Sequence, residues 1–140
     1  MNISWRDFYF QLAVLVSKKS HCERAKVGAI IVNGDSVVFG YNGTPSGHDN
    51  CCEDVSGETK PEVLHAEMNA IAKLAKNGGS KGDLKMFITR PPCMECAKLI
   101  LAAGINTVLF IEDEGSGEGL PLLAHHALVK AFKSSEINWG

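Results

Sequence analysis

The sequence lacks a strong net charge, a long hydrophobic run, an internal repeat and a low-complexity tract. Its 140 residues carry a formal net charge of -2. This balance argues against a protein that coats DNA or RNA, so no polynucleotide partner is expected and a small ligand suits the chain better. Because 45% of the residues are hydrophobic, the chain is expected to fold as one globular domain over 1–140.

The apolar segment near the N-terminus, RDFYFQLAVLVSKKS, does not predict a membrane anchor. Asp7 and Gln11 interrupt it, and the run is too short to span a bilayer. No A-x-A cleavage signal follows it, so an intracellular, cytoplasmic location without a membrane partner is expected. The segment instead predicts an amphipathic first helix capped by Ser4.

The five cysteines are an odd number, and in a reducing compartment they are a poor basis for a disulfide framework. Metal ligation, or burial as small hydrophobic side chains, remain as the alternatives. The residues concerned are Cys22, Cys51, Cys52, Cys93 and Cys96.

Hydrophobic periodicity and turn-forming residues predict alternating helices and strands. After the first helix, two β-rich runs flank the Asn33-Gly34 pair, which is typical of a tight hairpin, and a polar loop follows. Helices are expected over 64–76, 93–104 and 120–132, and strands over 84–89 and 105–112. This order predicts an α/β fold, a three-layer α/β/α domain with a mixed central sheet of about five strands.

Two of these helices begin with residues that bind metals. His65 and Glu67 open HAEMNAIAKLAK, and Cys93 and Cys96 form a C-x-x-C at the start of CMECAKLILAAG. Side chains of a helix lean toward its N-terminus, so both His65 and Glu67 can reach a site off the helix end. If the two starts point at one spot, His65, Cys93 and Cys96 give three ligands and leave a fourth position open, as in catalytic zinc sites.

Each half of this pattern also has a simpler explanation. A glutamate in a first helical turn is favoured by the helix dipole, and a lone C-x-x-C can be a redox pair or two buried thiols. A closed structural zinc module is a further alternative, but it requires a fourth protein ligand and leaves Glu67 unexplained. With both halves present and in order, H-x-E…P-C-x-x-C is the pattern of zinc nucleobase deaminases, in which the glutamate is the catalytic general acid–base.

The chain resembles the deoxycytidylate (dCMP) deaminase family, within the cytidine deaminase superfamily. The resemblance extends through RAKVGAIIV, GYNGTPSG, NCCE, HAEMNAI and PPCMECAKLILAAGI. It implies a cytidine deaminase-like fold, a catalytic Zn²⁺ and hydrolysis of dCMP to dUMP, which supplies the thymidylate precursor. It also implies a homo-oligomer, often a hexamer, that dCTP activates and dTTP inhibits, with Mg²⁺ accompanying the triphosphate. The nearest alternative is another zinc deaminase, acting on cytidine, tRNA adenosine or guanine.

The resemblance indicates further site residues. The substrate would contact Asn42 and Ala66, and the allosteric nucleotide would contact the loop of Tyr41, Asn42 and Gly43. Two nearby cations are candidate partners of the substrate phosphate, although solvated surface charge is the simpler role for each. These cations are Arg24 and Lys26.

Two features depart from that family's pattern. The chain has RPPC where Ser-Pro or Phe-Pro commonly precedes the first zinc cysteine, so Arg90 and Pro91 are expected to change the rim of the pocket. The segment between NCC and HAE is short, whereas some members carry an insertion there that helps to hold a second, structural zinc. The candidate ligands left for a second metal are Cys22, Cys51 and Cys52, which do not make a full set.

Overall fold

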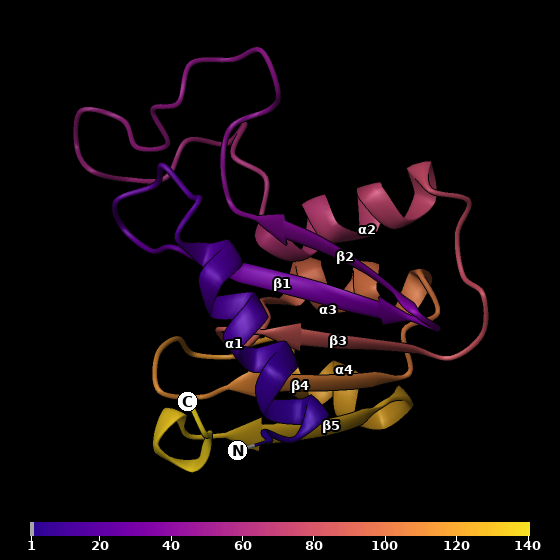
Figure 1. Ribbon diagram of the computed structural model, residues 1–140. Helices are drawn as coiled ribbons and strands as arrows, with labels where there is room; N and C mark the ends of the chain where they lie inside the picture. Colours follow the sequence, from indigo (N-terminus) through magenta and orange to yellow (C-terminus); the bar gives the residue numbers. More distant parts are fainter. Residues whose placement is uncertain (1) are drawn as a thin grey trace.

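The fold is a layered α/β arrangement, shown in Figure 1 as a computed structural model that describes residues 2–140. The helices are α1 (Trp5–Ser17), α2 (Ala66–Lys76), α3 (Met94–Ala102) and α4 (Leu120–His126). The strands are β1 (Gly28–Asn33), β2 (Ser36–Tyr41), β3 (Leu84–Ile88), β4 (Thr107–Ile111) and β5 (Leu128–Phe132), and a short 3-10 helix (Ser134–Glu136) follows. Helix α1 covers one face of the sheet, and α2, α3 and α4 cover the other. The predicted three-layer fold is confirmed.

The sheet is mixed, as predicted, with five strands in the order β2-β1-β3-β4-β5. Strand β1 is antiparallel to both β2 and β3, whereas β3, β4 and β5 are parallel to one another. The β1–β2 hairpin closes with Asn33 opposite Ser36, and Gly34 in the turn has a positive φ of 62°, a conformation that glycine adopts without steric cost. Strands β2, β3 and β4 therefore run in the same direction, and their C-terminal ends lie at the same end of the sheet.

Alternate residues of the strands serve two hydrophobic cores, because successive side chains of a strand point to opposite faces. The core under α1 includes Phe10, Ile30, Phe87 and Leu109. The core under α2, α3 and α4 includes Ile31, Met86, Ile100, Val108 and Leu123.

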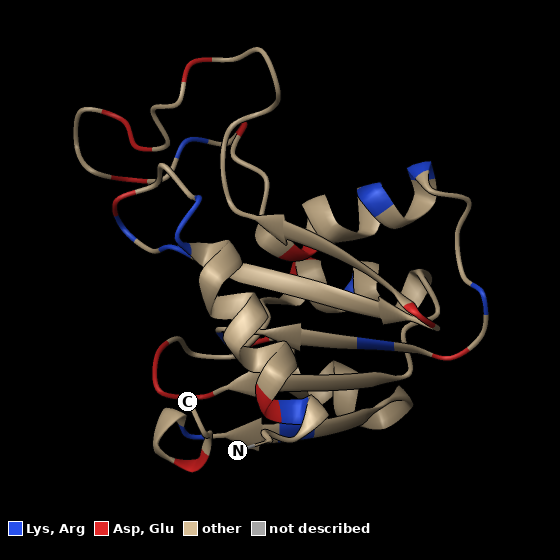
Figure 2. Ribbon diagram, viewed as in Figure 1, with Lys and Arg blue, Asp and Glu red and all other residues tan. Residues whose placement is uncertain are grey.

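The first helix begins as the sequence predicts. Ser4 is its N-cap residue, and the Ser4 hydroxyl accepts a hydrogen bond of 3.1 Å from the Asp7 backbone amide. Within residues 2–140, no helix combines the length and the apolar character needed to cross a bilayer. Figure 2 shows Lys and Arg interspersed with Asp and Glu along these residues rather than gathered over one element.

The last helix expected from the sequence, over 120–132, is wrong in its second half. Helix α4 ends at His126, Ala127 is extended, and Leu128–Phe132 form β5 at the edge of the sheet. Five parallel residue pairs join β5 to β4, from Thr107↔Leu128 to Ile111↔Phe132. A short apolar run is ambiguous between helix and strand, and here pairing with β4 decides the outcome.

Candidate active site

Helices α2 and α3 both begin at the end of the sheet where β2 and β3 finish. After the long loop, a β-bridge between Gly43 and Leu64 returns the chain to the end of β2, directly before α2. Gly40 allows α2 to pack closely on β2, because a Cβ at this position would overlap the Ala66 carbonyl and the Ala70 amide of the helix. The fold therefore places the two helix N-termini side by side.

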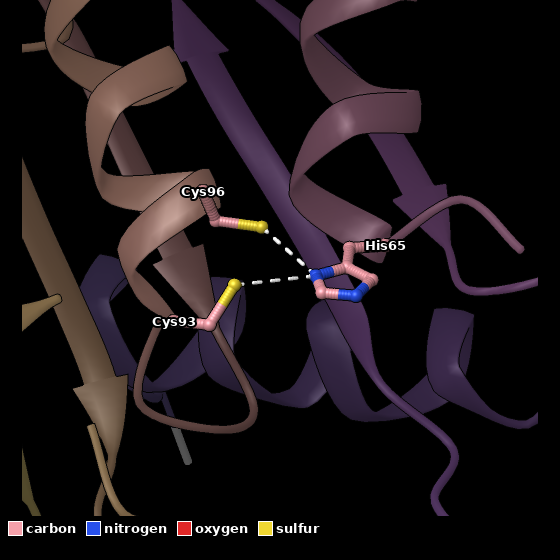
Figure 3. Close-up of side chains that lie close together, drawn as sticks. All are labelled: His65, Cys93 and Cys96. Atoms are coloured by element: carbon pink, nitrogen blue, oxygen red, sulfur yellow. Dashed lines mark hydrogen bonds between the residues drawn. The ribbon is translucent and has the colours of Figure 1, made fainter. Parts of the chain in front are cut away.

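The predicted metal ligands converge between these two helix starts. His65 and Cys93 are the N-cap residues of α2 and α3, and neither side chain forms a capping hydrogen bond. Cys96 lies in the first turn of α3. The Nδ1 atom of His65 lies 3.2 Å from Sγ of Cys96 and 3.4 Å from Sγ of Cys93. Figure 3 shows the three side chains pointing toward one another.

This geometry fits a zinc ion. A single imidazole nitrogen has one lone pair or one N–H, so it cannot form good hydrogen bonds to both sulfurs at once. In a tetrahedral site the usual Zn–N and Zn–S bond lengths place nitrogen and sulfur about 3.5 Å apart. Among residues 2–140, the group at this place comprises three ligands only, with all donor atoms within 4.8 Å of one another. A fourth position is left for a non-protein ligand.

Glu67 is buried beside these ligands, with only 5% of its surface exposed. Burial raises the pKa of its carboxyl from 4.5 to about 6, against hydrogen bonds from its own backbone amide and from Cys96 and the positive charge of Arg90. Burial also raises the pKa of the Cys96 thiol strongly, so a cation would be needed to hold Cys96 as a thiolate. Glu67 can thus exchange protons close to neutral pH.

A cavity of about 330 Å³ lies beside His65, Glu67 and Cys93. Ala66 also lines it and is the first residue of α2, so its backbone N–H has no partner within the helix. Asn42 reaches the cavity from the end of β2. Its side chain accepts a hydrogen bond from the Val27 amide and donates one to the Ala25 carbonyl, which holds the α1–β1 loop in place.

The two candidate phosphate partners lie in different surroundings. Arg24 lines the cavity, and its exposed guanidinium donates a 2.9 Å hydrogen bond to Glu58. The Lys26 ammonium instead donates to the backbone carbonyls of Ser20 and Cys22, at 2.7 and 2.9 Å. Lys26 is therefore engaged within its own loop.

The cysteines suggested for a second metal are arranged differently from that expectation. Cys22 and Cys52 form a disulfide, which also differs from the expectation of reduced thiols. The Cys51 side chain is exposed, and its thiol donates to the Glu53 carbonyl. With the Glu53 carboxylate, the sulfurs of Cys22 and Cys52 form a second group of possible metal donors within 4.8 Å of one another. While the two sulfurs are joined as a disulfide they are not thiolates, so zinc binding here would require reduction. The bond links the α1–β1 loop to the long loop before α2, two segments that contribute walls to the cavity.

A second cavity of about 450 Å³ lies next to the first, over the end of β2. Its walls include the three residues that the resemblance assigns to an allosteric nucleotide, Tyr41, Asn42 and Gly43. Asn42 lines both cavities. The second cavity is also lined by potentially cationic side chains, those of His21, His48 and Lys73.

One wall of the first cavity is not predicted by the sequence. Ser116 and Gly117, in the loop between β4 and α4, line it together with Arg90 and Pro91. The glycine-rich stretch DEGSGEG was the available signal, because glycines allow a backbone to pass close to other groups. Nothing in the local sequence indicates which part of the chain this loop approaches.

The chain is similar to known deaminases over most of its length. The family model of the cytidine and deoxycytidylate deaminase zinc-binding region matches residues 3–112. Human deoxycytidylate deaminase is 37% identical over 124 residues, covering 80% of this chain and 67% of the human protein. ComE operon protein 2 of Bacillus subtilis is 35% identical over 115 residues, covering 79% of this chain but only 61% of that protein, less than two thirds.

A solved structure resembles the whole fold. The dCMP deaminase of cyanophage S-TIM5, in complex with dCMP and dUMP, superposes with a TM-score of 0.87 at 40% identity, covering 94% of this chain and 99% of the phage chain. The match to the family model covers both helix starts that carry the metal ligands. The protein belongs to the cytidine and deoxycytidylate deaminase family.

Proposed function

We propose that the protein is a zinc-dependent hydrolase that converts dCMP to dUMP and so supplies a thymidylate precursor. Family membership supports the reaction class, and the similarity to human and cyanophage dCMP deaminases supports the substrate. One observation carries the proposal: Glu67 is buried beside a cavity and three convergent metal ligands. A structural zinc site does not require a buried carboxyl group beside its ligands.

In this reaction a water oxygen bonds to C4 of the cytosine ring, the bond from C4 to the amino nitrogen breaks, and ammonia leaves. Zinc held by His65, Cys93 and Cys96 would supply a Lewis acid that makes water nucleophilic at neutral pH. Glu67 accepts one proton from the water and passes it to ring atom N3; it then accepts the second proton from the hydroxyl on C4 and passes it to the amine, which leaves as ammonia while C4 becomes a carbonyl. A buried carboxyl group beside the open ligand position is placed to make both transfers.

The remaining cavity residues position the substrate. The free N–H of Ala66 can donate a hydrogen bond to the base, and the Asn42 side chain can reach the sugar. Arg24 supplies a cation at the rim, but it has to leave Glu58 in order to bind a phosphate. Lys26 has no part in this proposal, because it does not line the cavity and its ammonium donates to two carbonyls of its own loop.

The test is a substrate panel of dCMP, deoxycytidine, CMP and guanine, assayed with zinc-loaded protein. The specificity constant for dCMP should exceed that for deoxycytidine by about 10- to 100-fold, since hydrogen bonds to charged groups contribute about 1.5–3 kcal/mol. Equal constants would favour a cytidine deaminase, and preferential turnover of guanine would favour a guanine deaminase. Glu67→Gln protein serves as the inactive control.

We further infer that the second cavity is a nucleotide effector site, which dCTP occupies as activator and dTTP as inhibitor. Asn42 supports this because it lines both cavities, so an effector that moves it would change the substrate site directly. Lys73 and the two histidines can meet a triphosphate, with Mg²⁺ accompanying its oxygens. A homo-oligomer, a hexamer by the resemblance, would cover exposed apolar side chains of α1 such as Trp5 and Leu15.

Regulation requires each triphosphate to bind one of two conformations preferentially. The test is dCMP turnover against dCMP concentration, alone and with each nucleotide. At low dCMP concentration, the turnover rate should be higher with dCTP, and lower with dTTP, than without either nucleotide. Hyperbolic curves unchanged by either nucleotide would remove the regulatory proposal and leave the deaminase proposal intact. Light scattering of the zinc-loaded protein tests the hexamer.

A further inference from the structure

Arg90 differs from the other two arginines of the chain in having no acidic partner. Arg6 pairs with Asp7, and Arg24 pairs with Glu58, each at 2.9 Å. Within residues 2–140, no ion pair and no side-chain hydrogen bond of Arg90 is found. Yet Arg90 is half-buried and lines the catalytic cavity, three residues before the metal ligand Cys93.

The loop between β4 and α4 holds the Arg90 side chain in place. A Cβ on Gly115 would lie 2.8 Å from Nε and 3.0 Å from Cγ of Arg90, and Gly115 has a positive φ of 93°. Two residues further on, Gly117 comes similarly close to Pro91. The loop backbone thus covers the stem of Arg90, so the side chain loses less conformational freedom when its guanidinium binds a ligand.

The other charged groups of the cavity already have partners. The Glu53 carboxylate accepts hydrogen bonds from the backbone amides of residues 23 and 24. Arg24 is paired with Glu58. The positive charge of Arg90 acts on the pKa of Glu67, but no ion pair joins these two side chains. Arg90 is therefore the cation lining this cavity that, within residues 2–140, has no carboxylate partner. A planar guanidinium of this kind matches a phosphate group with two parallel hydrogen bonds.

We propose that Arg90 binds the 5′-phosphate of the substrate and so selects nucleoside monophosphates over nucleosides. The inference rests on the proposed deamination of dCMP. It assigns the principal phosphate contact to a residue at which the sequence departs from the family's usual pattern, rather than to Arg24 on the exposed rim. The alternative role of Arg90 is to balance the negative charge of Glu67 and of the two cysteine ligands. Phosphate binding and charge balance predict different kinetics.

The experiment compares zinc-loaded wild type, Arg90→Gln and Arg90→Lys with dCMP and with deoxycytidine. Arg90→Gln should lose about 10- to 100-fold in kcat/KM for dCMP, mainly through KM, and change little for deoxycytidine. Arg90→Lys should recover part of the loss, because it keeps the charge but not the planar pair of donors. Lys85→Gln, an exposed position on β3 away from the cavity, controls for the loss of one positive charge.

Equal losses on dCMP and deoxycytidine would assign Arg90 to charge balance, and an unchanged dCMP constant would remove the phosphate contact. Zinc content and thermal unfolding show whether each variant is folded. Calorimetric binding of dCMP and deoxycytidine to Glu67→Gln protein, with and without Arg90→Gln, decides the inference independently of turnover. Failure of the wild type to turn over dCMP would instead overturn the proposed function.

Discussion

Replacing Glu67 by glutamine tests whether burial of a carboxyl group at this position has a measurable cost. In the folded chain without metal, the pKa of Glu67 is raised from 4.5 to about 6, chiefly because the group is buried. A rise of this size corresponds to about 2 kcal/mol of free energy by which the ionised form destabilises the folded state. The glutamine variant cannot ionise, so it should not carry this cost.

The effect has a defined pH dependence. Below pH 4.5 the carboxyl is protonated in both the folded and the unfolded chain, so no ionisation cost exists. The cost grows as pH rises from 4.5 to about 6 and is constant above that. We therefore expect the free energy of unfolding of metal-free Glu67→Gln protein to increase by about 2 kcal/mol, relative to wild type, as the pH rises from 4 to 8. The fixed cost of burying an amide cancels in this comparison.

Urea unfolding of chelator-treated protein at several pH values measures the effect. Glu95→Gln is the matched control, since Glu95 lies in the first turn of α3 but is exposed. The free energy of unfolding of Glu95→Gln protein should change with pH in the same way as that of wild type. If the difference between Glu67→Gln and wild type does not change with pH, the pKa of Glu67 is not raised in the folded chain, and the reasoning is refuted. With zinc present, the same variant should keep its metal and lose about 10²–10⁴-fold in turnover.

Four further substitutions test the metal ligands, the disulfide and the packing of α2 on β2. His65→Ala and Cys96→Ser should each remove stoichiometric zinc in metal analysis, and retained zinc would show that these side chains are not ligands. Cys22→Ser should lower the free energy of unfolding by about 3–4 kcal/mol, because the disulfide closes a loop with a sequence separation of 30; equal urea midpoints with and without reductant would contradict this. Gly40→Ala should destabilise the fold by about 1–3 kcal/mol and weaken zinc binding, since its Cβ would push α2 and His65 away from β2; unchanged melting and zinc affinity would refute the close packing.

The sequence alone predicts the elements whose signals are local. Asn33-Gly34 closes the hairpin, Ser4 caps α1, and the two metal-binding motifs lie at helix starts. The alternation of strands and helices was enough to predict a mixed sheet with helices on both faces. These features depend on residues that are neighbours in the chain.

The features that the sequence does not predict depend on contacts between distant segments. Leu128–Phe132 form a strand where they pair with β4, although a short apolar run of this kind is ambiguous between helix and strand. The pairing of Cys22 with Cys52 depends on how two long loops meet. The contact between Arg90 and Gly115 likewise follows from the path of the β4–α4 loop. Polar side chains such as Lys26 can bind a ligand or a nearby carbonyl, and only the folded structure decides between them.

The most direct test of the account combines metal analysis with product analysis on the same sample. Protein carrying one zinc per chain should convert dCMP to equal amounts of dUMP and ammonia. Chelation should abolish this activity, and added zinc should restore it in proportion to the metal bound at His65, Cys93 and Cys96. Full turnover by metal-free protein, or one bound zinc per chain with no dUMP formed, would contradict the account.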